Sequence, residues 1–391
     1  MTEQQQRKLA CSISALSVFR GLLEKKPLRA LIATLTCPQN DADKMSHYGE
    51  FVHSLDEFGC SLSKFLERAI CEDENRYVIG TAQGQPLPPA LVRNAKAELE
   101  LLSSLTKLDA ASLCGSEGYV PEFENTPADF GEIYAERLRQ ISRYGYGIFA
   151  TAKMFRVAGD EILPVESADE ISLDSFVGYE EERRRVFDNT RALVEGRPAA
   201  NVLLCGDAGT GKSSTVKACA NYFADQGVRL IELRKDQLFS LSAVMGRIDG
   251  NPLKFIIFID DLSFNKNDDC FSMLKAALEG SASAKAKNAV IYATSNRRHI
   301  VKESFSDREN SDDIHHSDTV QELMSLSERF GLTVYFEKPS KALYLEIVHT
   351  LADKNGIAID RAELDIKAEA FALGRGIRSP RAAEQFINSL L

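Results

Sequence analysis

The chain has 391 residues, of which 44% are hydrophobic and 27% charged, a composition typical of a globular protein with room for two or three domains. Its net charge of −10 argues against a broadly basic nucleic-acid-binding surface and leaves only a local basic pore or patch open. The eight cysteines form no C-x-x-C pair, and no apolar run approaches the ~18 residues of a membrane span. We therefore expect reduced thiols, a cytoplasmic location and no membrane insertion.

Residues 1–160 are predicted to form a mostly helical accessory domain. Apolar residues recur at three-and-four spacing in RKLACSISALSVFRGLLEKK and SHYGEFVHSLDEFGCSLSKFLERAI, and again after the prolines of PPALVRNAKAELELLSSLTKL. The stretch NTPADFGEIYAERLRQISRYGYGIFATAKMFRV continues this helical pattern without strand-like alternation. None of these segments has the residue types of a catalytic site, so an accessory or partner-binding role is the simplest interpretation.

Residues 161–338 are predicted to form a second domain, in which the pattern changes after the acidic linker AGDEILPVESADEISLDSFVGYEEER. Short apolar runs alternate with helical stretches: NVLLC, VRLIEL, KFIIFID, NAVIYAT and LTVYF. Strands that alternate with helices predict an α/β fold with a parallel sheet covered on both faces. Residues 339–391 are helical again and are predicted to form a small separate bundle.

A glycine-rich stretch, GDAGTGKSS, follows the first of these runs and matches G-x-x-x-x-G-K-[ST]. Glycines allow backbone N–H groups to surround phosphates, and the following helix N-terminus favours an anion. The lysine would reach the β- and γ-phosphates, and the next serine would bind Mg²⁺. The alternative is a chance glycine-rich turn, which the strand–loop–helix context disfavours. The loop comprises Gly206, Asp207, Ala208, Gly209, Thr210, Gly211, Lys212, Ser213 and Ser214.

Two adjacent aspartates end the run KFIIFIDD. In phosphate-loop enzymes a second strand ends in an aspartate that holds Mg²⁺, and Asp260 fits that position. Asp261 would then activate or position the attacking water. The alternative is a helix N-cap or a solvated pair of turn residues.

Four further polar residues follow in chain order. Asn296 lies at the tip of NAVIYATSN, Arg329 lies in SERFG before the last strand, and Arg378 and Arg381 begin the final helix. A single arginine is more often a solvated surface charge. Taken together with Gly206–Ser214 and the two aspartates, however, the whole series resembles the AAA+ ATPase superfamily. More narrowly, it resembles an uncharacterised bacterial family of AAA+ ATPases of unknown function.

The resemblance covers residues 170–391 and implies a P-loop NTPase sheet, the AAA+ core, with a C-terminal helical lid. It identifies Asn296 with sensor one, Arg329 with the arginine finger and Arg381 with sensor two. Val177 and Gly178 belong to FVGYEE, which resembles the segment that packs near adenine. The implied ligands are ATP and Mg²⁺, with Asp260 and Ser213 on the metal and Lys212, Asp261, Asn296 and Arg329 in catalysis.

The resemblance also implies a homo-oligomeric ring in which Arg329 enters the neighbouring subunit's site, so that hydrolysis needs assembly. The partner would be an unidentified protein or nucleic acid. Most AAA+ hydrolases have Glu where this chain has Asp261, and a misplacement of ~1 Å can cost about 100-fold in rate. We therefore expect a slow, assembly-dependent ATPase that remodels or loads a macromolecule.

Three other functions remain open from the sequence: an ATP-dependent binding switch with negligible hydrolysis, a nucleic-acid loader, and a small-molecule kinase. The lid and SERFG count against the kinase. Leu238 and Phe239 could line a ring pore or form the packed face of a helix. His315 and His316 lie in a polar stretch that is expected to be a surface loop, not a metal site.

Overall fold

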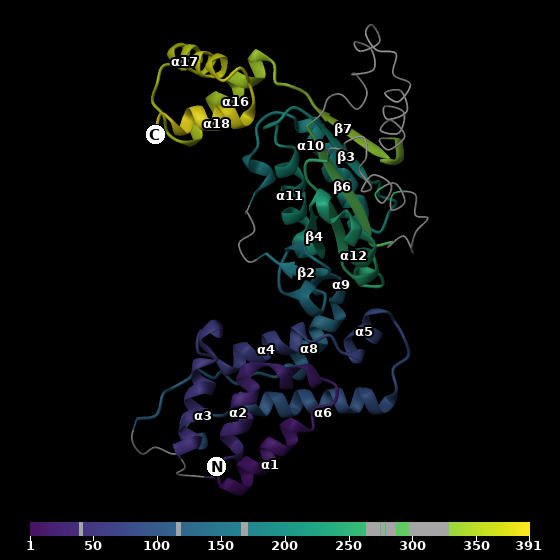
Figure 1. Ribbon diagram of the computed structural model, residues 1–391, viewed down its shortest axis with the longest axis vertical. Coiled ribbons are helices and arrows are strands. Elements are labelled where there is room, and N and C mark those ends of the chain that lie inside the picture. Colours follow the sequence, from purple (N-terminus) through teal and green to yellow (C-terminus); the bar gives the residue numbers. More distant parts are fainter. Residues whose placement is uncertain are drawn as a thin grey trace. The chain divides into compact units, whose positions relative to one another are not determined.

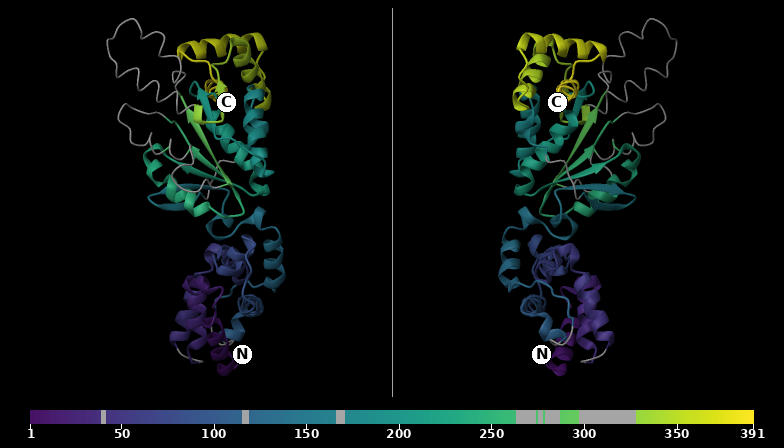
Figure 2. Two further views of the ribbon diagram at one scale, coloured as in Figure 1. Left: turned by 90° about the vertical axis from the view of Figure 1, so that its right-hand side faces the viewer. Right: turned by 90° about the vertical axis from the view of Figure 1, so that its left-hand side faces the viewer.

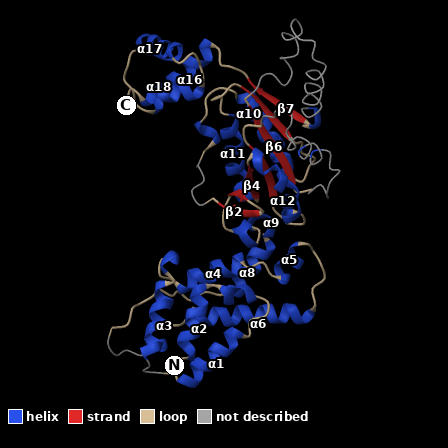
Figure 3. Cartoon of the chain, in the orientation of Figure 1, coloured by secondary structure: helices blue, strands red, loops and turns tan. Residues whose placement is uncertain are grey.

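A computed structural model describes residues 1–38, 42–114, 119–165, 171–262, 287–296 and 328–391, together with Leu274 and Leu278. The chain divides into two compact units, Met1–Thr151 and Ala152–Leu391 (Figure 1). The first unit is helical, and the second carries a sheet and a C-terminal helical bundle (Figure 3). The predicted fold class is thereby confirmed. His315 and His316 lie outside the described residues.

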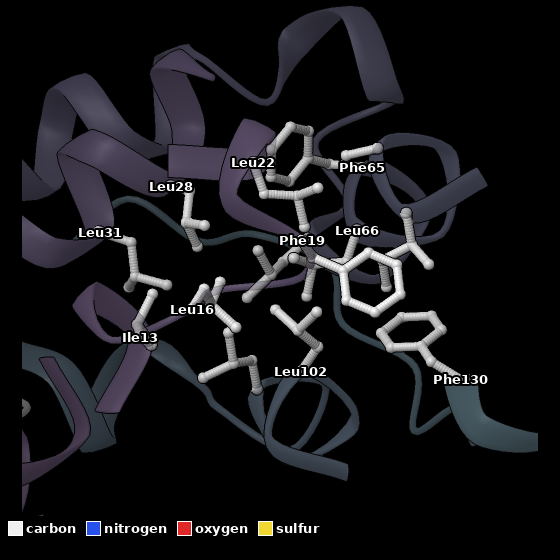
Figure 4. Close-up of a cluster of buried hydrophobic side chains, with 14 of the residues drawn as sticks. Ile13, Leu16, Phe19, Leu22, Leu28, Leu31, Phe65, Leu66, Leu102 and Phe130 are labelled. Atoms are coloured by element: carbon white, nitrogen blue, oxygen red, sulfur yellow. The ribbon is translucent and has the colours of Figure 1, made fainter. Parts of the chain in front are cut away.

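The N-terminal unit is held together by one apolar cluster, part of which is drawn in Figure 4. Leu22, Leu102 and Phe19 are fully buried in it. The buried Glu98 carboxylate accepts hydrogen bonds from the backbone N–H groups of residues 17–19, which satisfies donors just before the short 3-10 helix Arg20–Glu24. The helices are α1 (Glu3–Ser14), α2 (Lys26–Thr36), α3 (Ala42–His53), α4 (Leu62–Glu72), α5 (Arg76–Ala82), α6 (Pro89–Leu105), α7 (Ala110–Cys114), α8 (Phe130–Arg139) and α9 (Ile141–Tyr144).

The end of the helical prediction is wrong, because Met154–Ala158 forms strand β1 of the second unit. β1 pairs antiparallel with β2 (Glu161–Pro164) and parallel with β4 (Val228–Leu233). Phe155 and Val157 are buried while the residues after each are exposed, which is the two-residue period of a strand. Five residues are too few for that period to stand out from the preceding helical pattern.

The second unit contains a seven-stranded sheet in the order β2-β1-β4-β5-β6-β3-β7. Its other strands are β3 (Val202–Gly206), β5 (Lys254–Ile259), β6 (Ala289–Ser295) and β7 (Leu332–Phe336). All pairings except β1 with β2 are parallel, so the carboxyl ends of β5, β6 and β3 meet at one edge of the sheet. The polar residues that follow these three strands are therefore brought together.

The second unit also contains the helices α10 (Glu180–Val194), α11 (Lys212–Phe223) and α12 (Leu241–Ile248). The strands of the sheet can be followed in Figure 2. β3 is buried along its whole length, as expected of a central parallel strand covered on both faces. Val186, Val216 and Phe223 from α10 and α11 join residues of β3 and β5 in one core. This core holds the loop between β3 and α11 at the edge of the sheet.

The C-terminal bundle consists of α16 (Lys341–Lys354), α17 (Arg361–Gly374) and α18 (Pro380–Asn388). Side chains of Ser340, Asp360 and Ser379 accept backbone N–H groups and cap the three helices. The bundle has its own apolar core, which includes Tyr344 and Phe386. No helix in the described part of the chain is both long and apolar enough to cross a membrane.

Candidate nucleotide-binding site

The phosphate loop leaves β3 with glycines in conformations that other residues rarely adopt. Gly206 has φ +143°, and a Cβ there would lie 2.0 Å from the backbone oxygen of Phe336 on β7. Gly209 and Gly211 have φ values of +77° and +90°, and α11 begins directly afterwards at Lys212. The loop therefore has the backbone freedom and the helix N-terminus that phosphate binding requires.

Lys212 is 5% exposed and lies along the phosphate loop. Its Nζ donates to the carbonyl oxygens of Gly206 (2.9 Å) and Asp207 (2.8 Å) and to Oδ1 of Asn296 (3.0 Å). Burial lowers the pKa of Lys212, and nearby acidic groups, the two Asp residues after β5 among them, act in the opposite direction. The ammonium group is thus held at the centre of the loop by neutral acceptors.

The Asp260 carboxylate receives two short hydrogen bonds on one oxygen. Ser213 Oγ and Thr294 Oγ1 each lie 2.6 Å from Asp260 Oδ1. Hydroxyl and carboxylate oxygens are the hard ligands that Mg²⁺ prefers, usually one or two carboxylates with waters and phosphates. The residues present therefore fit a bound Mg²⁺, which Ser213 and Asp260 would hold.

Asp261 has a left-handed backbone, with φ +54°. Its N–H donates to Thr294 Oγ1 at 2.9 Å, and its Oδ1 accepts from Asn296 Nδ2 at 2.8 Å. Asp and Asn tolerate this conformation better than longer side chains do. The local backbone thus gives a physical reason for Asp, and not Glu, at this position.

A cavity of about 320 Å³ extends from the phosphate loop. Polar residues of the loop, both aspartates and Asn296 line one part of it. Apolar side chains line another part: Phe176, Val177, Ile347 and Leu351. A lining that combines polar, cationic groups with apolar side chains matches a ligand that has phosphates attached to a planar heterocycle.

The lid helices contribute directly to this cavity. Arg381 N donates to the Gly209 oxygen at 3.3 Å, and the exposed Arg381 side chain lines the cavity. Gly178, with φ +73°, lies where a Cβ would be 2.6 Å from Leu343 of α16. The entry segment and α16 therefore approach more closely than a larger residue at 178 would allow.

The structure brings the sequence-predicted site residues together at this cavity, except for Arg329. Gly209, Lys212, Ser213, Asp261 and Asn296 all line the cavity, as do the remaining loop residues from Ala208 to Ser214, with Asp260, Val177 and Arg381. Gly206, Asp207 and Gly178 lie beside it, in the loop and the entry segment. Arg329 lies just before β7, half-buried, outside the set of described residues that line this cavity.

Thr294 and Arg183 are among the cavity residues that sequence reasoning missed. Thr294 precedes Asn296 by two positions, so the two-residue period of a strand could have placed both on one side. Arg183 shares a helical face with the buried Val186 and Thr190, and a charge in that pattern is the signal.

The structure also shows the surroundings of Arg378 and of the pair Leu238 and Phe239. Arg378 is held by Glu369 through two hydrogen bonds of 2.9 and 2.8 Å, which makes it part of the lid's internal structure. Leu238 is 1% exposed and packs inward, whereas its neighbour Phe239 is 57% exposed. The packed interpretation therefore applies to Leu238 and not to Phe239, and a pore-lining role for Phe239 stays a prediction.

The strand order β4-β5-β6-β3-β7, with a phosphate loop after β3, two aspartates after β5, a polar tip on β6 and a helical lid, defines the AAA+ class of P-loop nucleotide-binding folds. The family described as "Protein of unknown function (DUF815)" matches residues 150–391, more than half of the chain, and the chain belongs to it. No curated protein sequence matches the chain.

Among solved structures, the RuvB Holliday junction branch migration motor of Thermotoga maritima is similar. It is 14% identical with a TM-score of 0.34, over 56% of this chain and 72% of that chain. A mutant of the same protein is 13% identical with a TM-score of 0.35, over 56% and 72% of the two chains. The fold assignment rests on the strand order and the site.

Proposed function

We propose that this protein is a Mg²⁺-dependent ATPase that hydrolyses ATP slowly in a homo-oligomeric ring and couples hydrolysis to remodelling or loading of a macromolecular partner, a protein or a nucleic acid. One observation carries the proposal. A continuous chain of hydrogen bonds joins Lys212 to Asn296 and Asn296 to Asp261 at the wall of the cavity. A phosphate-binding lysine is thereby connected to the carboxylate that would handle the attacking water.

The residues have distinct roles in this proposal. Lys212 exchanges its carbonyl partners for phosphate oxygens when a nucleotide enters, so its charge moves from neutral acceptors to anionic ones. Ser213 and Asp260 hold Mg²⁺, which when bound neutralises and orients the phosphates. Asn296 and Asp261 position water, and Arg381 links the lid to the nucleotide.

The geometry at Asp261 supports the proposal of slow turnover. Its side chain is one methylene shorter than Glu, and Asn296 already occupies one carboxylate oxygen. The left-handed backbone fixes where the carboxylate can reach. A general base contributes about 10²–10⁴ in rate, and only when it is within reach of the proton that it removes.

Assembly is proposed from the position of Arg329. This residue precedes β7, which pairs with β3 alone in the described part of the sheet. Tyr335 on the same strand is 52% exposed. A second copy docked at this edge would receive Arg329 in its own cavity, where a finger arginine is worth about 10³–10⁵ in rate.

The Asn296–Asp261 hydrogen bond also favours a second candidate, an ATP-dependent binding switch with negligible hydrolysis. In that case the bound amide keeps the carboxylate away from water. The two candidates differ in a single assay, which follows phosphate release and oligomer size together with MgATP. A rate of phosphate release per subunit that rises with protein concentration supports the assembly-dependent ATPase. ATP-driven oligomers without phosphate release support the switch. If MgATP causes neither phosphate release nor a change in oligomer size, both candidates are contradicted.

A further inference from the structure

Arg183 lies on the buried face of α10, whose other residues are apolar or neutral. Val186 and Thr190, three and seven residues later, are fully buried on the same face. The Arg183 side chain is 10% exposed, so its guanidinium has lost most of its water. A charge in such a position is costly unless it has partners.

Few partners for this guanidinium lie among the described residues. Its one ion pair is with Glu180 at 3.8 Å, and the Glu180 side chain is 80% exposed, so that pair is weak. Its side chain makes no hydrogen bond within the described structure. Burial lowers the pKa of Arg183, which reflects the same loss of solvent. None of its nitrogens is among the fully enclosed polar atoms without a partner in the described part of the chain, so the N–H donors that lack a close acceptor still face the cavity.

The guanidinium lines the nucleotide cavity and lies against one of its apolar walls. Its central carbon is 5.0 Å from the centre of the Phe176 ring, within cation–π distance. Phe176 belongs to the apolar part of the cavity, with Val177, Ile347 and Leu351. A planar heterocycle bound there would meet an aromatic surface and a set of donors together.

We propose that Arg183 is a specificity-determining residue that donates hydrogen bonds to ring nitrogens of the bound purine base. The inference rests on the proposed function, since it deepens the description of the same nucleotide site. Phosphates are held by Lys212 and the glycine loop, so Arg183 acts on the nucleoside part alone. Hydrogen bonds to a charged donor are stronger than neutral ones, which makes its contribution to affinity measurable.

The test is an equilibrium binding measurement on the full chain with two probes, the non-hydrolysable analogue AMP-PNP and inorganic tripolyphosphate, each with Mg²⁺. Arg183→Met keeps the length and apolar stem of the side chain and removes the donors. We expect it to weaken AMP-PNP binding by roughly tenfold or more and to leave tripolyphosphate binding within about twofold. Equal loss of both probes, or no loss of AMP-PNP, would overturn the proposal.

Arg184→Met is the matched control. Arg184 is the next residue on the same helix, 65% exposed and paired with Glu181 at 2.8 Å. The same substitution there should leave the affinity for both probes unchanged. A comparable loss of AMP-PNP affinity in Arg184→Met would assign the effect to the charge of α10 and contradict a specific role for Arg183.

A second measurement needs only the unmodified protein, so it holds even where Arg183→Met does not fold. The affinities of 1-deaza-, 3-deaza- and 7-deaza-ATP are compared with that of ATP. We expect at least one to bind roughly tenfold more weakly, and equal binding of all three would refute the proposal. If the unmodified protein binds neither AMP-PNP nor tripolyphosphate, the proposed function itself fails, an outcome distinct from failure of the Arg183 role alone.

Discussion

Thr294 and Asp260 are joined by a 2.6 Å hydrogen bond from the threonine hydroxyl to one carboxylate oxygen. The same hydroxyl oxygen accepts the N–H of the next residue, Asp261, at 2.9 Å. A carboxylate cannot donate, so the single Thr294 proton is committed to Asp260. Thr294 therefore positions the Asp260 carboxylate and the Asp261 backbone at once, and its 2% exposure keeps water from competing.

Replacing Thr294 by Val removes the hydroxyl at nearly constant shape. A hydrogen bond to a charged group contributes about 1.5–3 kcal/mol, so we expect Thr294→Val to slow ATP hydrolysis by roughly tenfold or more and to raise the Mg²⁺ concentration needed for half-maximal rate. Thr294→Ser retains the hydroxyl and serves as the control, with a rate near that of the unmodified protein. Equal rates for Val and Ser at all Mg²⁺ concentrations would rule out this positioning role.

Asp261→Asn keeps a residue that suits the left-handed backbone and removes the charge. We expect nucleotide binding to persist while phosphate release falls by about 10²–10⁴, the contribution of a general base. Asp261→Glu is the companion variant, and because Glu fits φ +54° less well it should not accelerate turnover. Faster phosphate release in Asp261→Glu would show that chain length alone limits the rate.

Gly206→Ala tests the link between the phosphate loop and the sheet. The new Cβ would lie 2.0 Å from the Phe336 backbone oxygen, so β3 and β7 must separate. We expect a loss of about 3 kcal/mol or more in the free energy of unfolding. Gly211→Ala meets no atom within 4 Å and carries only the strain of φ +90°, about 1–2 kcal/mol. Chemical denaturation of both variants measures the difference.

The Arg378–Glu369 pair makes the lid sensitive to acid. The hydrogen bonds from Arg378 lower the pKa of Glu369, while burial opposes them. Because the folded pKa is below the unfolded value of 4.5, the stabilisation is complete above about pH 4.5 and is lost as pH falls through the folded pKa. The protection factors of amides in α17 and α18, which are corrected for the intrinsic pH dependence of exchange, should therefore fall below pH 4.5 more in the unmodified protein than in Glu369→Gln. Parallel pH profiles would refute this link.

The sequence was sufficient for features that depend on local spacing. The phosphate loop, the aspartate pair and Asn296 all follow buried strands directly, and a parallel sheet aligns strand ends. The role of Thr294 depends instead on register: Ile259 on β5 pairs with Ala293 on β6, which brings the next residues, Asp260 and Thr294, side by side. Residue spacing along one chain does not determine that pairing.

Two other features also required the tertiary structure. β1 is a five-residue strand whose partner, β4, lies more than 70 residues further on, so its helical prediction failed. The sequence shows Arg183 as a charge on a buried helical face, but it does not show the contact with Phe176, a residue that the sequence places in a linker. The local sequence preference for helix or strand predicts neither the β1–β4 pairing nor the Arg183–Phe176 contact.

Subunit mixing tests the central claim most directly. Lys212→Ala should remove phosphate binding from its own site, and Arg329→Ala should remove the finger from its neighbour's site. Each variant alone should be nearly inactive in MgATP phosphate release, since the finger is worth about 10³–10⁵ in rate. An equimolar mixture should recover a substantial fraction of the unmodified rate, increasing with protein concentration. A rate of phosphate release per subunit that is independent of protein concentration and unaffected by Arg329→Ala would contradict an ATPase assembled from neighbouring subunits.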